Sequence, residues 1–241
     1  RETGIFLTVL GFGTGNLKDS RMEQLADKGN GNYAYVDNIL EAKKVFINEF
    51  GGTLFTIAKD VKLQLEFNPA KVKAYRLIGY ENRTLQSEDF NDDKKDAGEL
   101  GAGHTVTALY EIVPASAKGT PTGSVDELKY QQTQLNKQAI GIDEILTLKL
   151  RYKEPEGSKS KLISAAVSGK ALAPGKTSNN FRFAAAVASF GMLLRDSEFK
   201  GNATYAQTLE LAQGALGKDV EGYRAEFIRL VNSRVLLSDR R

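Results

Sequence analysis

The run of residues 5–10, Ile-Phe-Leu-Thr-Val-Leu, places the strongest constraint on the fold because it is apolar almost without interruption. A strand with one face in water alternates apolar and polar residues, whereas a strand buried on both faces does not. The run therefore predicts an inner strand of a parallel sheet. A glycine-rich turn at 11–16, a helix, a short strand at 33–36 and a helix ending near Phe50 extend this pattern to a β-α-β-α unit.

The sequence contains residues typical of the start and the end of the first helix. Ser20 and Glu23 have the spacing of a capping box, and Gly29 is placed to end the helix. Only half of a parallel sheet falls within residues 1–50, so we expect them to be the closing part of an α/β domain whose remaining strands lie elsewhere. Such a piece has no cysteines and buries too little surface to be stable alone.

Composition narrows the class of protein. The chain is 41% apolar and 26% charged, as expected for a soluble globular protein, and its apolar runs are too short to span a bilayer. The absence of cysteine excludes disulfides and thiolate chemistry but leaves the compartment open. A net charge of +3 is too balanced for an electrostatic footprint on nucleic acid.

The spacing of apolar residues changes after Gly51-Gly52, from helical spacing to alternation. Apolar residues at Val61, Leu63, Leu65 and Phe67 alternate with polar ones, which predicts a strand with that face buried. Further strands are expected at 72–80, 105–113, 146–152 and 162–167. Together they predict an antiparallel β-sandwich over residues 51–168, with a long polar insertion near 115–143.

Helical spacing dominates the C-terminal part, residues 169–241. A helix at 181–195 is apolar nearly all round and is expected to be buried, and two amphipathic helices follow it. The predicted fold class is α+β: a C-terminal fragment of an α/β domain (1–50), an antiparallel β-sandwich (51–168) and a C-terminal helical segment (169–241).

Several segments carry a family resemblance. Residues 5–16 and 22–33 resemble the end of a von Willebrand factor type A domain. A more specific likeness, to the C-terminal part of the bacterial YfbK-like proteins, is carried by VKLQLEFNP (61–69), YRLIGYENR (75–83), DFNDD (89–93) and GHTVTALYE (103–111). In that family a type A domain is followed by a β-rich region and a helical tail, and the resemblance covers essentially the whole chain.

The resemblance implies a metal site only outside these residues. Type A domains bind a divalent cation through an Asp-x-Ser-x-Ser element, which does not occur in this sequence. No metal ligand is carried over. The full-length protein is thus expected to have a divalent cation site, and this chain is expected to have no cofactor.

Two loops merit separate consideration as ligand sites. Gly11, Gly13 and Gly15 stand between a buried strand and a helix, where a dinucleotide would bind, but a tight turn is the favoured interpretation. Asp89, Asn91 and Asp93 begin like a calcium-binding loop that lacks its glycine and its distal glutamate. We interpret that loop as an acidic turn and keep the three residues as a minor metal candidate.

Catalytic groups are scarce. His104 is the only histidine and has no serine elbow or cysteine to work with, so we interpret it as structural. No catalytic residue is assigned. The basic and aromatic residues of 71–76 could contact single-stranded nucleic acid, but lysines on an edge strand are the favoured interpretation.

These observations lead to a functional hypothesis. The chain is expected to be a non-catalytic binding or scaffold region of a bacterial cell-envelope protein, periplasmic or extracellular, with a lipoprotein as one option. It is expected to bind a protein partner, a second copy or the missing N-terminal half, with no nucleic acid and with membrane anchoring only through a missing N-terminus. The alternative is a cation-assisted hydrolase that uses His104 and the 89–93 loop.

Overall fold

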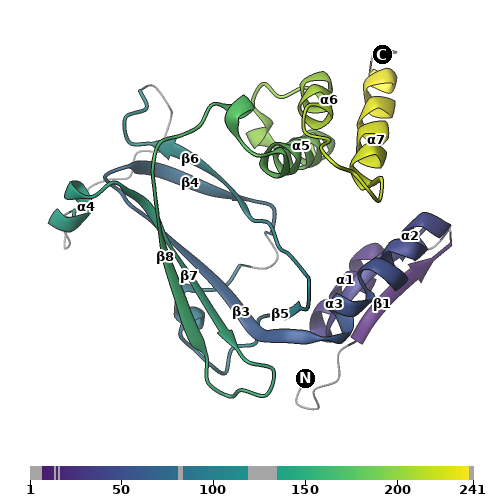
Figure 1. Cartoon of the computed structure of the whole chain (residues 1–241), viewed down its shortest axis with the longest axis horizontal. Coiled ribbons are helices and arrows are strands. Elements are labelled where there is room, and N and C mark those ends of the chain that lie inside the picture. The colour runs from purple at the N-terminus through teal and green to yellow at the C-terminus, as the bar shows by residue number, and fades with distance from the viewer. Residues whose placement is uncertain (1–6, 14, 16, 81–83, 119–134, 239–241) are drawn as a thin grey trace. The chain divides into compact units, whose positions relative to one another are not determined.

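The computed structural model describes residues 7–13, 15, 17–80, 84–118 and 135–238 (Figure 1). The chain divides into two compact units built from interleaved segments. Unit 1 comprises Arg1–Lys71, Thr84–Val106 and Tyr130–Ser168, and unit 2 comprises Val72–Arg83, Thr107–Lys129 and Gly169–Arg241. The sequence predicted three consecutive domains with boundaries at residues 50 and 168, and that division stays a prediction.

The fold class is confirmed as α+β, with antiparallel sheets and helices at the C-terminal end. The strands expected to form one sandwich fall into both units, as a four-stranded and a two-stranded sheet. The sandwich over 51–168 therefore stays a prediction. Within the described part of the chain, no helix is both long enough and apolar enough to cross a bilayer.

Unit 1 begins with the predicted β-α-β element. Strand β1 (Leu7–Phe12) pairs in parallel with β2 (Asn30–Val36), and α1 (Asp19–Lys28) connects them. The predicted capping box is wrong, because Lys18 is the N-cap and provides no side-chain hydrogen bond. A Cβ atom at Gly31 would lie 2.0 Å from the carbonyl oxygen of Leu7, so glycine is what permits the close approach of the two strands.

The second helix is irregular. It begins as α2 (Ile39–Lys43), continues as the π-helical turn η1 (Lys44–Asn48) and ends as α3 (Phe50–Leu54). The side chain of Asn38 caps its start by accepting hydrogen bonds from the backbone of Leu40 and Glu41. Gly51 and Gly52, expected to end the helix, lie inside α3.

The main sheet of unit 1 is antiparallel and has the strand order β5-β3-β7-β8. Its strands are β3 (Thr56–Phe67), β5 (Gly98–Gly101), β7 (Glu144–Lys153) and β8 (Lys161–Ser168). Two short helices accompany it, η2 (Ser87–Phe90) and α4 (Lys137–Gly141). Of the predicted insertion near 115–143, residues 119–134 lie outside the described part of the chain.

The register of the sheet separates an apolar face from a polar one. Three cross-strand rows form the apolar face: Leu63–Leu150–Ile163, Leu65–Leu148–Ala165 and Phe67–Leu146–Val167. The predicted alternation in β3 is correct, but the predicted burial is wrong in part. Leu63 is 48% exposed, whereas Lys62 on the polar face is only 2% exposed. The reason is a loop that packs on the polar face of β3 and binds Lys62.

A bulge near the start of β3 sets the position of its side chains. The pairing with β7 shifts between Lys59 and Lys62, and the pairing with β5 shifts between Ala58 and Val61. Asp60 lies in this bulge with a left-handed φ of 49°. A bulge changes the direction in which local side chains point, and here it places an acidic residue within the sheet.

Unit 2 combines a two-stranded antiparallel sheet with helices. Strand β4 (Val72–Ile78) pairs with β6 (Leu109–Pro114). The helices are η3 (Pro174–Lys176), α5 (Asn179–Leu194), η4 (Glu198–Lys200), α6 (Tyr205–Gln213) and α7 (Tyr223–Ser238). Ser178 caps α5, and a Thr204–Gln207 capping box starts α6.

The helices of unit 2 enclose a small core. Phe190 makes edge-on ring contacts with Tyr205 and Phe227, while Ala186 and Val231 are fully buried. The expectation that α5 is buried all round is wrong, because Phe181 and other large side chains of α5 are exposed. Ala186 and Phe190 of α5 pack in the core, whereas Phe181, Val187 and Leu194 are exposed.

The burial of Phe67 provides a test of the sheet assignment. Phe67 is 9% exposed and ends β3 on the apolar face, whereas its neighbour Glu66 is exposed. We expect Phe67→Ala to lower the free energy of unfolding by about 3–5 kcal/mol and Glu66→Ala to change it by less than about 1 kcal/mol. Chemical denaturation measures both, and equal effects would contradict the register of β3.

Candidate functional site

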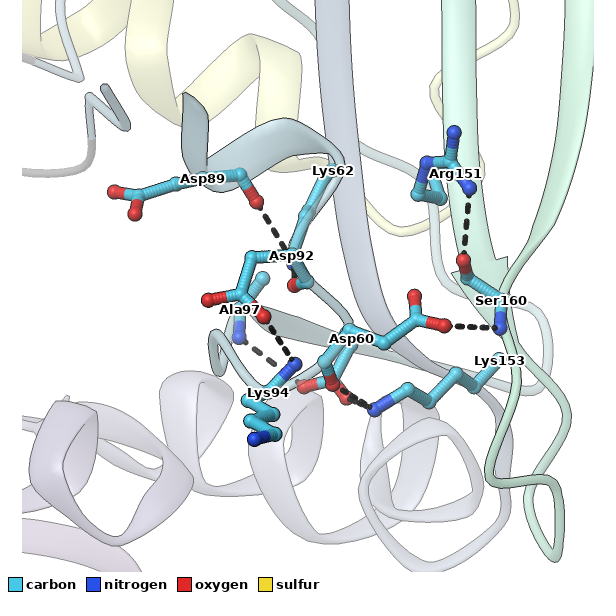
Figure 2. A network of polar contacts seen from close by, with 10 residues as sticks. Asp60, Lys62, Asp89, Asp92, Lys94, Ala97, Arg151, Lys153 and Ser160 are labelled. Carbon is cyan, nitrogen blue, oxygen red and sulfur yellow. Dashed lines mark hydrogen bonds and ion pairs between the residues drawn. The ribbon is translucent and has the colours of Figure 1, made fainter. Parts of the chain in front are cut away.

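The most concentrated group of polar side chains lies on the polar face of the main sheet, where residues 87–97 pack against β3 and β7. Its centre is Lys62, whose Nζ donates to the carbonyl oxygens of Asp89 at 3.1 Å and Asp92 at 2.5 Å. Figure 2 shows the Lys62 side chain extending from β3 toward the backbone of that loop. A buried ammonium group is tolerated only when it has such partners, so the loop and Lys62 depend on each other.

A second lysine ties the same loop to β7. The Lys153 ammonium lies 2.6 Å from Asp60 Oδ2 and 2.7 Å from the carbonyl oxygen of Asp93. Asp60 Oδ1 accepts a hydrogen bond from the backbone N–H of Ala97 at 3.2 Å (Figure 2). Both partners of the ion pair are largely buried, so removing either one would leave an uncompensated charge.

Arg151 of β7 is the third cation on this face. It donates to Ser160 Oγ at 2.9 Å and to Asn91 Oδ1 at 3.0 Å. Its guanidinium also lies 5.3 Å from the ring centre of Phe90, the apolar anchor of the loop. Arg151 Nε and Asp93 Oδ1 are buried without a hydrogen-bond partner.

The predicted calcium-type residues serve to hold the loop in place. Asp89 forms an ion pair with Lys95 at 3.1 Å, and Asn91 accepts from Arg151. Asp93 accepts from the backbone N–H of Ser160 at 3.4 Å, and hydrogen bonds from Ser160 lower the pKa of its carboxyl group. Each of the three side chains thus has a different partner in the protein.

A different acidic cluster does converge. Within the described residues, the one group of three His, Cys, Asp or Glu side chains that could hold a metal ion is Asp60, Asp96 and Glu99, and one carboxylate oxygen from each lies within 4.8 Å of the others. Burial, followed by the charges of Asp60 and Asp96, raises the pKa of Glu99 from 4.5 to about 7, and Lys59 and Lys153 partly oppose this. One oxygen of Glu99 is buried without a partner.

The acidic cluster could bind a cation, but groups of the protein already balance much of its negative charge. Three converging carboxylate oxygens suit a hard cation, and Asp60, Asp96 and Glu99 could hold one. The ammonium of Lys153 already binds Asp60, and a proton on Glu99 reduces the negative charge further. Sequence reasoning missed this cluster. Its one signal is the pair Lys59-Asp60, two consecutive polar residues that break the alternation of β3 at the bulge.

The remaining candidates lie apart from this cluster. His104 is exposed in the turn after β5, and its backbone N–H donates to the Gly101 carbonyl at 3.1 Å. In the 11–16 turn, Gly13 and Gly15 have φ values of +82° and +125°, as a tight strand-to-helix turn requires. Residues 14 and 16 of that turn lie outside the described part of the chain.

The basic residues of 71–76 are partly neutralised within the protein. Lys71 pairs with Asp143 at 3.3 Å, and Arg76 pairs with Glu111 at 2.5 Å. Arg76 also stacks 4.1 Å from the ring centre of Phe199. These contacts favour the structural interpretation of this strand over a platform for single-stranded nucleic acid.

Comparison with known protein sequences identifies the family of this chain. Residues 52–237 match the family described as "Uncharacterized protein YfbK, C-terminal", and the chain belongs to that family. The chain is also 44% identical over 231 residues to "Uncharacterized protein YfbK" of Escherichia coli (strain K12). That alignment covers 96% of this chain but only 39% of the relative. No solved structure matches the chain.

The buried position of Lys62 leads to a stability prediction. Lys62→Met keeps most of the side-chain volume but leaves the carbonyls of Asp89 and Asp92 without their charged donor. We expect a loss of about 1–3 kcal/mol in the free energy of unfolding. Lys149→Met is the matched control on the same face, because it removes only a partly exposed ion pair with Glu66 and should cost less than about 1 kcal/mol. Equal losses in denaturant titrations would contradict the proposed role of Lys62.

The raised pKa of Glu99 predicts a pH dependence. Because the folded state holds this proton more tightly than the unfolded state, Glu99 stabilises the fold fully below its ordinary pKa of 4.5, and this contribution is lost as the pH rises to about 7. We therefore expect the difference in unfolding free energy between Glu99→Gln and the unmodified chain to grow between those pH values and to be constant outside them. Denaturant titrations across pH measure it, with Glu156→Gln in an exposed turn as control. A pH-independent difference would contradict the prediction.

Proposed function

We propose that this chain is a non-catalytic protein-binding region of a bacterial envelope protein of the YfbK family, and that residues 7–55 are the part that binds. The observation that carries the proposal is the incomplete α/β element of unit 1. Among the described residues it consists of two parallel strands and their helices, and many of its apolar side chains are exposed. Parallel sheets are normally covered on both faces and contain more strands than two.

The exposed apolar residues concentrate on one helical segment. Ile39, Leu40, Ala42, Phe46 and Ile47 of α2 and η1, together with the stem of Lys43, line an open groove of about 430 Å³. Ile39 is 80% exposed and Ile47 is 69% exposed. A contiguous apolar patch of this kind is typical of a surface that another protein segment covers.

We assign this surface to the remainder of the full-length polypeptide. The chain spans 39% of its Escherichia coli relative, so most of that relative lies outside the match. Additional parallel strands from the remainder would pair with the open edge of β1, and apolar side chains would cover α2 and η1. A type A domain that includes residues 1–50 is consistent with this proposal.

The hydrolase alternative has less support. Asn91 binds Arg151 of β7, Asp93 accepts from Ser160, and Asp89 pairs with Lys95 of the same loop. His104 is exposed in a separate turn. We infer a region that works without a cofactor or a catalytic residue of its own. A periplasmic or extracellular location, with any membrane anchor in another part of the polypeptide, is part of the same proposal.

Hydrogen–deuterium exchange tests the proposed surface. The chain is measured alone and after addition of the portion of the Escherichia coli relative that lies outside the matched region. We expect slower exchange in β1 and in residues 39–55, because strand pairing and apolar burial protect backbone amides.

Two variants make this test specific. Ile47→Asp should abolish the protection, whereas Val220→Asp, at an 89% exposed position of unit 2, should leave it unchanged. An unchanged exchange pattern on mixing, with the added portion shown to be folded by circular dichroism, would contradict the proposed surface.

A further inference from the structure

A second surface, independent of the proposed function, lies at the edge of the main sheet. Strand β8 is the outermost strand beside β7 (Figure 1), and its other edge pairs with no strand among the described residues. All eight of its residues are exposed, including Leu162, Ile163 and Val167 at 50%, 54% and 44%. Its free backbone N–H and C=O groups are therefore accessible to another strand.

Strand β8 lacks the features that usually prevent edge pairing. Natural edge strands are shortened, bulged, or protected by proline and charged side chains. The sequence of β8, Lys-Leu-Ile-Ser-Ala-Ala-Val-Ser, contains no proline, and its one charge is at the first residue. Its pairing with β7 is regular from Leu146 to Tyr152. The opposite edge, β5, has four residues and shifts its register twice.

We propose that β8 pairs antiparallel with β8 of a second copy of this chain, so that two main sheets become one continuous sheet. A two-fold axis perpendicular to the sheet keeps each face on the same side, so odd-numbered residues must pair with odd-numbered ones. Centring the axis on Ala165 pairs Ile163 with Val167 of the second copy and Ala165 with itself. The opposite face then pairs Leu162 with Ser168 and Ser164 with Ala166.

This register is self-complementary in both shape and charge. On the apolar face, β-branched residues lie opposite each other and extend the rows that begin at Leu63 and Phe67. The two Lys161 side chains lie at opposite ends of the paired strands, so no like charges meet. The blunted β5 edge cannot offer an equivalent strand, which favours a closed dimer over an open chain of subunits.

Cysteine substitution tests the pairing and its register together, because the chain contains no cysteine. In an antiparallel pair, directly opposite Cα atoms lie about 4.5–5.5 Å apart, within disulfide range. We expect the intact Ala165→Cys chain to form a disulfide-linked dimer under mild oxidation, and Ser164→Cys to do so far more slowly. No cross-linking of Ala165→Cys, or equal rates for the two variants, would overturn the proposed pairing.

The unmodified chain provides the second measurement. Sedimentation equilibrium at rising concentration should show a species of twice the chain mass of 26.4 kDa. Ala165→Lys brings like charges together on the axis and should raise the dimer dissociation constant by at least about tenfold, whereas Val220→Lys should not. Two outcomes would overturn the proposal. One is a chain that stays monomeric at about 100 μM, which is 100 times the dissociation constant of a micromolar dimer. The other is a chain that forms only species larger than a dimer.

Discussion

The burial of the Lys62 ammonium is the constraint on which unit 1 depends most. A charge removed from water must be satisfied within the protein, and Lys62 is satisfied by two backbone carbonyls of the loop over its face. That requirement fixes the loop, which in turn supplies oxygens to Lys153 and Arg151 of β7. One face of the sheet is thus held by charge-assisted hydrogen bonds and the other by apolar rows, so the two faces carry different physical roles.

The negative charge of the acidic cluster is also balanced by groups within the protein. Asp60 lies in the bulge of β3 and is neutralised by Lys153, while burial keeps a proton on Glu99 up to near-neutral pH. Such a cluster resembles a metal site in its composition, but here internal cations and a proton offset much of its charge. The network ties the loop, β3, β5 and β7 together, and this structural role is a sufficient reason for its presence.

What the family relationship adds is context for the exposed surfaces. The chain belongs to the YfbK C-terminal family and spans 39% of its Escherichia coli relative. An apolar helical groove on residues 39–47 and an unprotected edge at β8 are two distinct kinds of surface. The groove suits side-chain burial against another segment, and the edge suits backbone pairing. The groove carries the proposed function, and the edge carries the separate proposal of a dimer.

Local sequence patterns determined the elements of this protein, and tertiary structure determined its site. The apolar run at 5–10 predicted a strand where β1 begins, and the alternation in β7 and the helical spacing of the C-terminal part predicted their elements correctly, because strand and helix periods are properties of neighbouring residues. The expected burial of β1 on both faces is wrong for the described residues, since Leu7 and Phe12 are exposed and the strand pairs with β2 alone. The burial of Lys62 and the convergence of Asp60, Asp96 and Glu99 could not be predicted in this way. They depend on a bulge and on a loop that returns to the sheet about 30 residues later, and such contacts between distant segments form only when the chain folds.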